Sequence, residues 1–256
     1  MRVSRPLASY LTYTLGNDLY IPLTSRCNSK TLPQTRGPNF LLPAPVVASL
    51  CRVRDMEQGT QQWTYWCNYL DTQEGSQMLP EPLERISELP GTDKSNQLPA
   101  MLTEILSEIE PYLKKNTIQT IVFAGEGEPT LRLEHLLRIV ARLKESHGTD
   151  LPPLRLTTNG LILSSNMAER LKSSGISKVS VALMTADPKQ YQELMDPLDI
   201  ANGHDRVCQF IAEAVQAGLE VETTGVDRKE VDKTATEALA KKLQVSSDFR
   251  WRPHFY

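Results

Sequence analysis

The sequence of 256 residues lacks the features that direct a chain into a membrane, across one, or onto nucleic acid. No apolar run approaches the length of a membrane-spanning helix. The net charge of −3 gives none of the basic excess that binds nucleic acid. Residues 1–15 contain no apolar core followed by a small-residue cleavage site, so no secretory signal is indicated. These absences predict a soluble, intracellular, cytoplasmic protein, with a short organellar presequence left open by Arg2, Ser4, Arg5 and Ser9.

Cysteine is also scarce, and no two cysteines form a C-x2-C pair. The four cysteines are widely spaced along the chain: Cys27, Cys51, Cys67 and Cys208. A disulfide framework needs more closely spaced cysteines, whereas scattered ones are typical of reduced thiols in an intracellular protein. Because Cys51 falls within a predicted helix, we expect it to face the core, and we expect Cys208 to be structural too.

The most informative stretch that is present is TIQTIVFAGEGEPT, residues 117–130. Its first half is a short β-branched and aromatic run, which predicts a strand buried on both faces. Two glycines and then a helical pattern follow, and this places backbone N–H groups and a carboxylate at the edge where α/β proteins bind ligands. Glu126 and Glu128 favour an amine as that ligand. The alternative is a tight turn with two solvated glutamates.

Strands and helices alternate regularly after residue 99. Predicted strands cover residues 19–24, 118–124, 154–158, 178–183, 219–224 and 249–252. Predicted helices cover residues 45–56, 101–113, 133–143, 165–173, 188–195, 206–217 and 229–243. Six parallel strands are too few to close an eight-stranded barrel, so we expect a single α/β domain over residues 1–256, an open, partial (β/α)6 TIM-type barrel. A doubly wound sheet is the alternative.

Proline in the first predicted strand indicates that this strand lies at a margin of the sheet, because Pro22 cannot donate a hydrogen bond to a neighbour. The last strand, residues 249–252, is expected at the other margin. Residues 59–98 do not fit the alternation and are predicted to be an insertion. Its aromatic cluster, which includes Trp63 and Trp66, would anchor the insertion to the body or cover a pocket.

Six segments, taken in order, bear a family resemblance: YIPLTSRCN, FAGEGEPTLR, LRLTTNGL, VSVALMTADPKQY, VETTGVDRKEVD and FRWRPHF. Each segment contains or follows a predicted strand. Together they resemble the radical S-adenosylmethionine (SAM) superfamily, and within it the branch linked to TatD-type nucleases. The resemblance covers most of residues 18–256 apart from the insertion.

The resemblance implies a [4Fe–4S] cluster held by three cysteines spaced C-x3-C-x2-C, with SAM chelated by the remaining iron. By position, Cys27 is the first of these metal ligands, while Thr31 and Gln34 replace the second and third. A hydroxyl and an amide are poor ligands for cluster iron. Arg36 matches a basic residue that often follows the third cysteine. The degenerate motif puts catalysis in doubt, and restoring both cysteines is expected to raise iron retention if the loop keeps the family's path.

The residues that the resemblance assigns to SAM binding match the superfamily better than the cluster-binding cysteines do. The resemblance implies that the turn after the second strand holds the SAM amine, with Glu128 as the acidic residue, and that later strand ends add contacts. The implied cofactor-binding residues are Gly125, Gly127, Glu128, Thr158, Asn159 and Ser180. The alternatives are an ordinary turn at Asn159 and a core hydroxyl bonded to backbone at Ser180. We expect Gly125, Gly127, Glu128, Asn159 and Cys27 to converge on one pocket at the carboxyl ends of the strands.

Three functions remain open from the sequence. The first is a radical SAM enzyme that depends on an iron–sulfur cluster and acts on an unknown substrate. The second is a cluster-less protein that keeps the SAM pocket. The third is a non-catalytic interaction module, in which the Cys27 loop or the insertion at residues 59–98 contacts a protein partner.

Overall fold

A computed structural model describes residues 10–58, 100–162, 164, 166–198, 200 and 202–256. The predicted insertion at residues 59–98, with Cys67, lies outside these described residues. The fold that follows is therefore the fold of the remaining chain, which includes every predicted strand.

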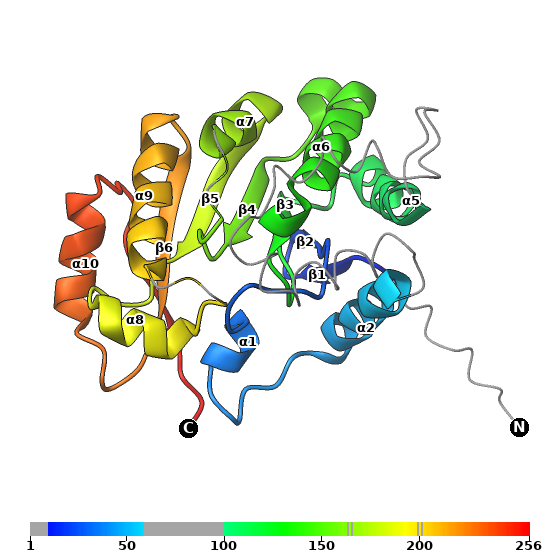
Figure 1. Ribbon diagram of the computed structural model, residues 1–256. Helices are drawn as coiled ribbons and strands as arrows, with labels where there is room; N and C mark the ends of the chain where they lie inside the picture. Colours follow the sequence, from blue (N-terminus) through cyan, green and yellow to red (C-terminus); the bar gives the residue numbers. More distant parts are fainter. Residues whose placement is uncertain (1–9, 59–99, 163, 165, 199, 201) are drawn as a thin grey trace, which may run out of the picture.

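The centre of the fold is a seven-stranded sheet whose strands lie in chain order. The strands are β1 (Tyr13–Leu15), β2 (Asp18–Ile21), β3 (Thr120–Phe123), β4 (Leu154–Thr158), β5 (Ile176–Ala182), β6 (Glu220–Asp227) and β7 (Arg250–Pro253). β1 runs antiparallel to β2, and each later neighbouring pair is parallel. Because β1 and β7 are the two margins and do not pair, the sheet stays open. The predicted open, partial barrel is confirmed (Figure 1).

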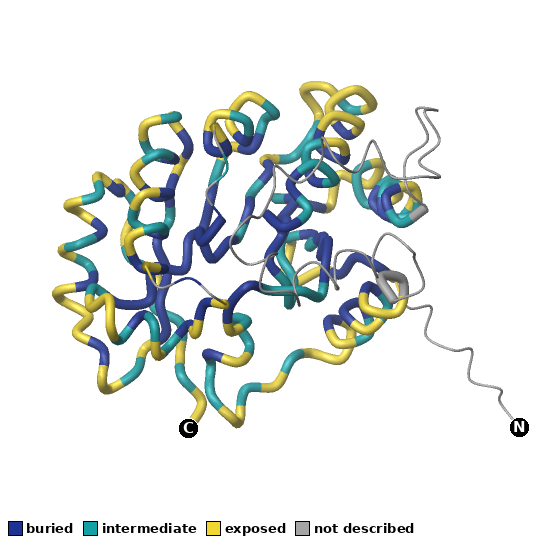
Figure 2. Tube along the Cα trace, viewed as in Figure 1, coloured by how far each residue is buried: buried dark blue, intermediate teal, exposed yellow. Residues whose placement is uncertain are grey.

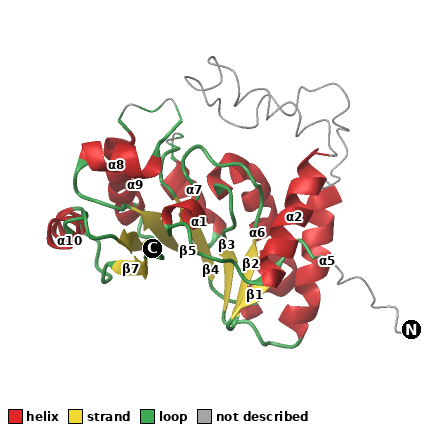
Figure 3. Cartoon of the chain, turned by 90° about the horizontal axis from the view of Figure 1, so that it is seen from below, coloured by secondary structure: helices red, strands yellow, loops and turns green. Residues whose placement is uncertain are grey.

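Helices follow the strands and cover the sheet. They are α1 (Leu32–Thr35), α2 (Ala44–Gln58), α5 (Ala100–Lys114), α6 (Leu133–His147), α7 (Met167–Ser174), α8 (Pro188–Met195), α9 (Gly203–Gln216) and α10 (Lys233–Lys242), with short 3-10 turns η2 (Pro129–Arg132) and η3 (Gly148–Asp150). Figures 1 and 3 show α6, α7, α9 and α10 ranged along the outside of the curved sheet. Within the described residues, no helix combines the length and the apolarity needed to cross a membrane.

The core lies between the sheet and these outer helices. Along α6 the buried residues recur every three or four positions, at Leu136, Ile139, Val140 and Leu143, so one stripe of the helix faces the sheet. On the strand side Phe123 is fully buried, as expected for a strand covered on both faces. Figure 2 shows the result, with dark-blue strands and yellow outer helix surfaces.

The prediction that the first strand of the sheet contains Pro22 and lies at its margin is wrong. The margin is β1, which pairs with β2 through a two-residue turn at Gly16, whose φ is 61°. Tyr13 of β1 stacks on Tyr20 of β2 with ring centroids 5.2 Å apart. Pro22 follows the last paired residue, Ile21, so it does not interrupt the pairing of β2 on either side. The expected margin at the other end is confirmed as β7.

Candidate functional site

A cavity of about 280 Å³ lies at the carboxyl ends of the parallel strands. It is close to the lower end of the range of roughly 300–1,000 Å³ that small-molecule sites occupy. All seven residues that the sequence singled out line it: Cys27, Gly125, Gly127, Glu128, Thr158, Asn159 and Ser180. The expected convergence on one pocket is confirmed, because parallel strands bring their following loops to a common edge.

Glu128 is the most tightly held of these residues. Its Oε1 accepts hydrogen bonds from the Thr130 N–H at 3.0 Å, the Thr130 hydroxyl at 2.7 Å and the Thr158 hydroxyl at 2.8 Å. Its Oε2 accepts one from the Asn159 N–H at 2.7 Å. Burial raises the pKa of Glu128 above its ordinary value, and the four donors oppose that rise. The carboxyl therefore ties the turn after β3 to the end of β4, and Oε2 keeps capacity for one further donor.

The two glycines of the turn allow close packing of backbone on backbone. A Cβ on Gly127 would overlap the carbonyl oxygens of Thr24 and Arg26, and a Cβ on Gly125 would lie 2.6 Å from the Cβ of Pro22. The Glu128 N–H donates to the Arg26 carbonyl at 2.7 Å in the same place. The glycines therefore fit the turn against the loop that contains Cys27, and they line the cavity as well.

Cys27 lies beside a set of polar side chains at the end of β2. Its Sγ is 3.7 Å from the Ser29 hydroxyl and 3.7 Å from Nδ2 of Asn159. The same Nδ2 donates to Oδ1 of Asn28 at 2.7 Å and to the Ser29 hydroxyl at 3.1 Å. Burial raises the pKa of the Cys27 thiol to about 11, and the nearby Glu128 adds to that rise. Burial therefore favours the protonated thiol of Cys27 over its thiolate.

Asn159 forms the turn that the sequence left as the alternative, and it also lines the cavity. Its Oδ1 accepts from the Leu161 N–H at 3.0 Å, and Gly160 has φ of 69°, so the pair forms a turn stabilised by the asparagine side chain. Its amide nitrogen meanwhile points to the Cys27 loop and lines the cavity. The turn at Asn159 and Gly160 therefore forms part of the cavity wall through Asn159.

Thr31 and Gln34, which the resemblance matches to the second and third cysteines, lie at the start of a helix that the sequence reasoning missed. The Thr31 N–H donates to Oε1 of Gln34 at 2.7 Å, which caps the first turn of α1. Gln34 is exposed, and neither residue lines the cavity. The Thr31-Leu-Pro-Gln34 pattern is a capping-box signature with proline in the first turn, and it was the available signal for this helix.

The donor set does not fit a [4Fe–4S] cluster. Among the described residues, no group of three histidine, cysteine, aspartate or glutamate side chains could hold a metal ion. Cys51 is exposed on α2, where the buried stripe runs through Val46, Leu50 and Val53, so the expectation that it faces the core is wrong. Cys208 is half-buried on α9, with Sγ 3.9 Å from Nδ1 of His204. In the part of the chain described, Cys27 is the one thiol at the cavity.

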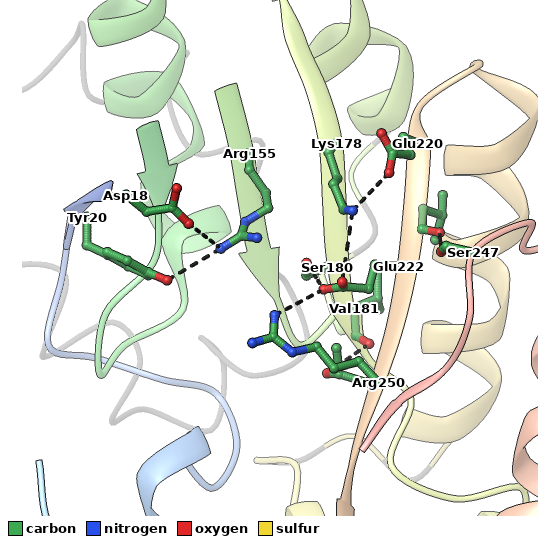
Figure 4. Close-up of polar contacts among 12 residues, drawn as sticks. Asp18, Tyr20, Arg155, Lys178, Ser180, Val181, Glu220, Glu222, Ser247 and Arg250 are labelled. Atoms are coloured by element: carbon green, nitrogen blue, oxygen red, sulfur yellow. Dashed lines mark hydrogen bonds and ion pairs between the residues drawn. The ribbon is translucent and has the colours of Figure 1, made fainter. Parts of the chain in front are cut away.

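Charged residues that the sequence reasoning missed lie on the strands around the cavity: Arg155 and Arg250 line it, and Glu222 contacts Ser180. The Ser180 hydroxyl donates to Oε2 of Glu222 at 2.6 Å, so its partner is a carboxylate and not backbone as expected. Figure 4 shows Ser180, Glu222 and Arg250 pointing toward one another. Arg155 points toward Tyr20 and Asp18, with Nη2 3.7 Å from the Asp18 carboxylate. The period-2 placement of these residues was the signal, and a solvent-facing strand shows the same pattern.

The larger part of this chain matches the model of a known protein family. The family model for the Radical SAM superfamily matches residues 95–238, more than half of the chain. A "Probable GTP 3',8-cyclase" of Methanococcus aeolicus is 36% identical over 119 residues, which cover 46% of this chain and 36% of that protein. One of Sulfurisphaera tokodaii is 33% identical over 129 residues, which cover 50% of this chain and 37% of that protein. The chain thus spans little more than a third of the length of these curated relatives.

Among solved structures, "Native anSMEcpe with bound AdoMet" superimposes with a TM-score of 0.55 at 13% identity. The match covers 92% of this chain and 50% of that one. At this identity the likeness shows the fold alone, and it agrees with the open, curved sheet described above.

Proposed function

Because the chain belongs to the radical SAM superfamily, we propose that it keeps the superfamily's cavity as a small-molecule binding site that works without an iron–sulfur cluster, with SAM as the ligand. The observation that favours this proposal most is the contact between Thr31 and Gln34. The two positions that would supply thiolates instead cap a helix whose third residue faces solvent. A cluster needs cysteine ligands, and the described part of the chain has one at the cavity.

The remaining cavity residues suit the amino-acid and apolar parts of SAM. A ligand amine would use the free acceptor capacity of Glu128 Oε2, which is buried and therefore gains from a charge-assisted hydrogen bond. Ala182, Met184 and Met195 form an apolar wall that suits an adenine ring. One charge-assisted bond contributes roughly 1.5–3 kcal/mol, so binding without the iron chelate is expected to be weak.

The superfamily's chemistry is cleavage of SAM by a reduced cluster, and a cluster-less site cannot supply the electron for it. We therefore do not extend the cyclase activity named for the relatives to this chain, which spans little more than a third of them. The branch linked to TatD-type nucleases remains part of the proposal. It depends on segments such as YIPLTSRCN and FRWRPHF, which lie outside the residues that the family model matches.

Anaerobic reconstitution with iron and sulfide, followed by calorimetric titration with SAM, tests the proposal. The expected result is little bound iron together with saturable, weak SAM binding that is lost in Thr158→Val, which removes a hydroxyl that positions Glu128. About four irons per chain and SAM cleavage on reduction would instead establish a working radical enzyme. Absence of any SAM binding would leave the cavity for another ligand and refute the choice of SAM.

A further inference from the structure

Three arginines line the cavity from two segments that are far apart in sequence. Arg36 follows α1, and Arg250 and Arg252 occupy alternate positions of β7, so they share one face of that strand. Nε of Arg36 donates to the Pro253 carbonyl at 2.7 Å, and the Phe255 N–H donates to the Arg36 carbonyl at 2.7 Å. These bonds hold the Arg36 loop against the end of β7, so the three guanidinium groups lie at the same end of the cavity.

The negative charge at this end of the cavity is too small to balance the three arginines. The carboxylate that contacts the group is Glu222, with Oε2 3.7 Å from Nη1 of Arg250. Within the described residues, the Arg252 side chain makes no hydrogen bond or close ion pair, although the charge of Glu222 acts on it from a distance. The Arg36 side chain contacts the Pro253 carbonyl and the rings of Phe40 and Phe255. Three guanidinium charges and one carboxylate leave about two positive charges unbalanced. The other cavity carboxylates are occupied elsewhere, since Glu126 pairs with Arg54 at 2.7 Å and Glu128 accepts four hydrogen bonds.

The arginines also repel one another. Burial lowers the pKa of Arg252 to about 10, and the charges of Arg250 and Arg36 lower it further in the same direction. Burial and the charge of Arg250 lower the pKa of Arg36. Because a guanidinium group keeps its proton in proteins, the repulsion persists in the free protein. A bound anion would relieve it.

We propose that Arg36, Arg250 and Arg252 form a phosphate-binding site at the β7 end of the cavity, and that a ligand of this protein has a phosphoryl group. The dianion of a phosphate monoester matches the two unbalanced charges, whereas a carboxylate would neutralise one of them. Guanidinium groups fit phosphate oxygens with paired hydrogen bonds. In the strand order, β4, β5 and β6 separate Glu128 on the β3 turn from Arg250 and Arg252 on β7. SAM has no phosphate to offer the three arginines.

Calorimetric titration of the whole chain at low salt with pyrophosphate, inorganic phosphate and acetate tests the proposal. Pyrophosphate and phosphate should bind to the wild type, with acetate much weaker. Arg252→Gln and Arg250→Gln should each weaken phosphate binding about tenfold or more, because each removes a charged hydrogen-bond donor. Arg252→Lys should restore part of the loss by keeping the charge.

The matched control is Arg142→Gln, an exposed arginine on α6 paired with Glu145, which should leave phosphate binding unchanged. Circular dichroism and melting curves verify that each variant is folded. The proposal is overturned if the wild type does not bind either phosphate, if acetate binds as tightly as phosphate, or if Arg142→Gln and Arg252→Gln behave alike. SAM titration of the same variants is a separate measurement, so failure of the SAM proposal leaves this result unaffected.

Discussion

The Thr31 N–H donates a hydrogen bond to Oε1 of Gln34 across 2.7 Å, and these are the two positions that the sequence resemblance matches to the second and third cysteines of the motif. The bond satisfies a backbone donor that the first turn of α1 would otherwise leave free. The loop after β2 is also held by the bond from the Glu128 N–H to the Arg26 carbonyl and by the contact of Asn159 with Asn28.

Iron content provides the first prediction. The double variant Thr31→Cys with Gln34→Cys is expected to retain no more iron than the wild type, because the side chain at position 34 faces solvent and neither position lines the cavity. Restoring both cysteines should raise iron retention only if the loop keeps the family's path, and these side-chain positions do not favour that path. Iron, sulfide and visible absorbance after anaerobic reconstitution measure this, with Cys27→Ser as the control. If the double variant binds a cluster and the Cys27→Ser control does not, the loop can rearrange to bind iron.

Metal removal provides the second prediction. Treating the purified protein with a strong chelator is expected to leave its melting temperature unchanged, since a metal that binds only the folded state would add stability that the chelator removes. Differential scanning calorimetry with and without chelator is the measurement. A drop in melting temperature that added iron reverses would contradict the absence of a resident metal.

Glu128 gives the third prediction. Glu128→Ala leaves the buried N–H groups of Thr130 and Asn159 without their acceptor, and each unpaired donor costs about 1–3 kcal/mol. The free energy of unfolding should fall by about 2–5 kcal/mol in urea titrations. Glu126→Ala is the matched control, because Glu126 makes a partly exposed ion pair with Arg54 and should cost at most about 1 kcal/mol. If the free energy of unfolding falls equally in the two variants, the hydrogen bonds of Glu128 do not stabilise the fold.

The regular part of the fold could be predicted from sequence because several local signals agreed there. β4 over residues 154–158 and α8 over residues 188–195 have the predicted bounds, since each lies between clear turn residues. β1 was missed because three residues are too few to show a period. Because β1 was missed, the next strand was wrongly placed at the margin of the sheet. Pro22 was also counted as part of that strand, which ends at Ile21.

The loop residues of the candidate site could be predicted from the sequence, but its charged strand residues could not. Glycines and turn residues after strands mark a cavity edge wherever strands are parallel, and that rule found Gly125, Glu128 and Asn159. The sequence could not show that Glu128 is held by four hydrogen bonds, because two of the donors, Thr158 and Asn159, come from the end of the next strand. Nor could it distinguish Arg250 or Arg252 from solvent-facing residues, since facing the inside of an open barrel is a tertiary property.

The pH dependence of stability gives the last prediction. Burial lowers the pKa of His135 on α6 to about 3, and the charges of Arg132 and Arg138 act in the same direction. In the unfolded chain its pKa is about 6.5, so below that pH the unfolded state takes up a proton that the folded state does not. His135 therefore contributes stability that is present above about pH 6.5 and is lost as the pH falls toward 3. Between pH 7 and pH 5.5 the free energy of unfolding should fall by about 1 kcal/mol more in the wild type than in His135→Gln, measured by urea titration at both pH values. The same fall in both proteins would mean that His135 titrates normally when folded.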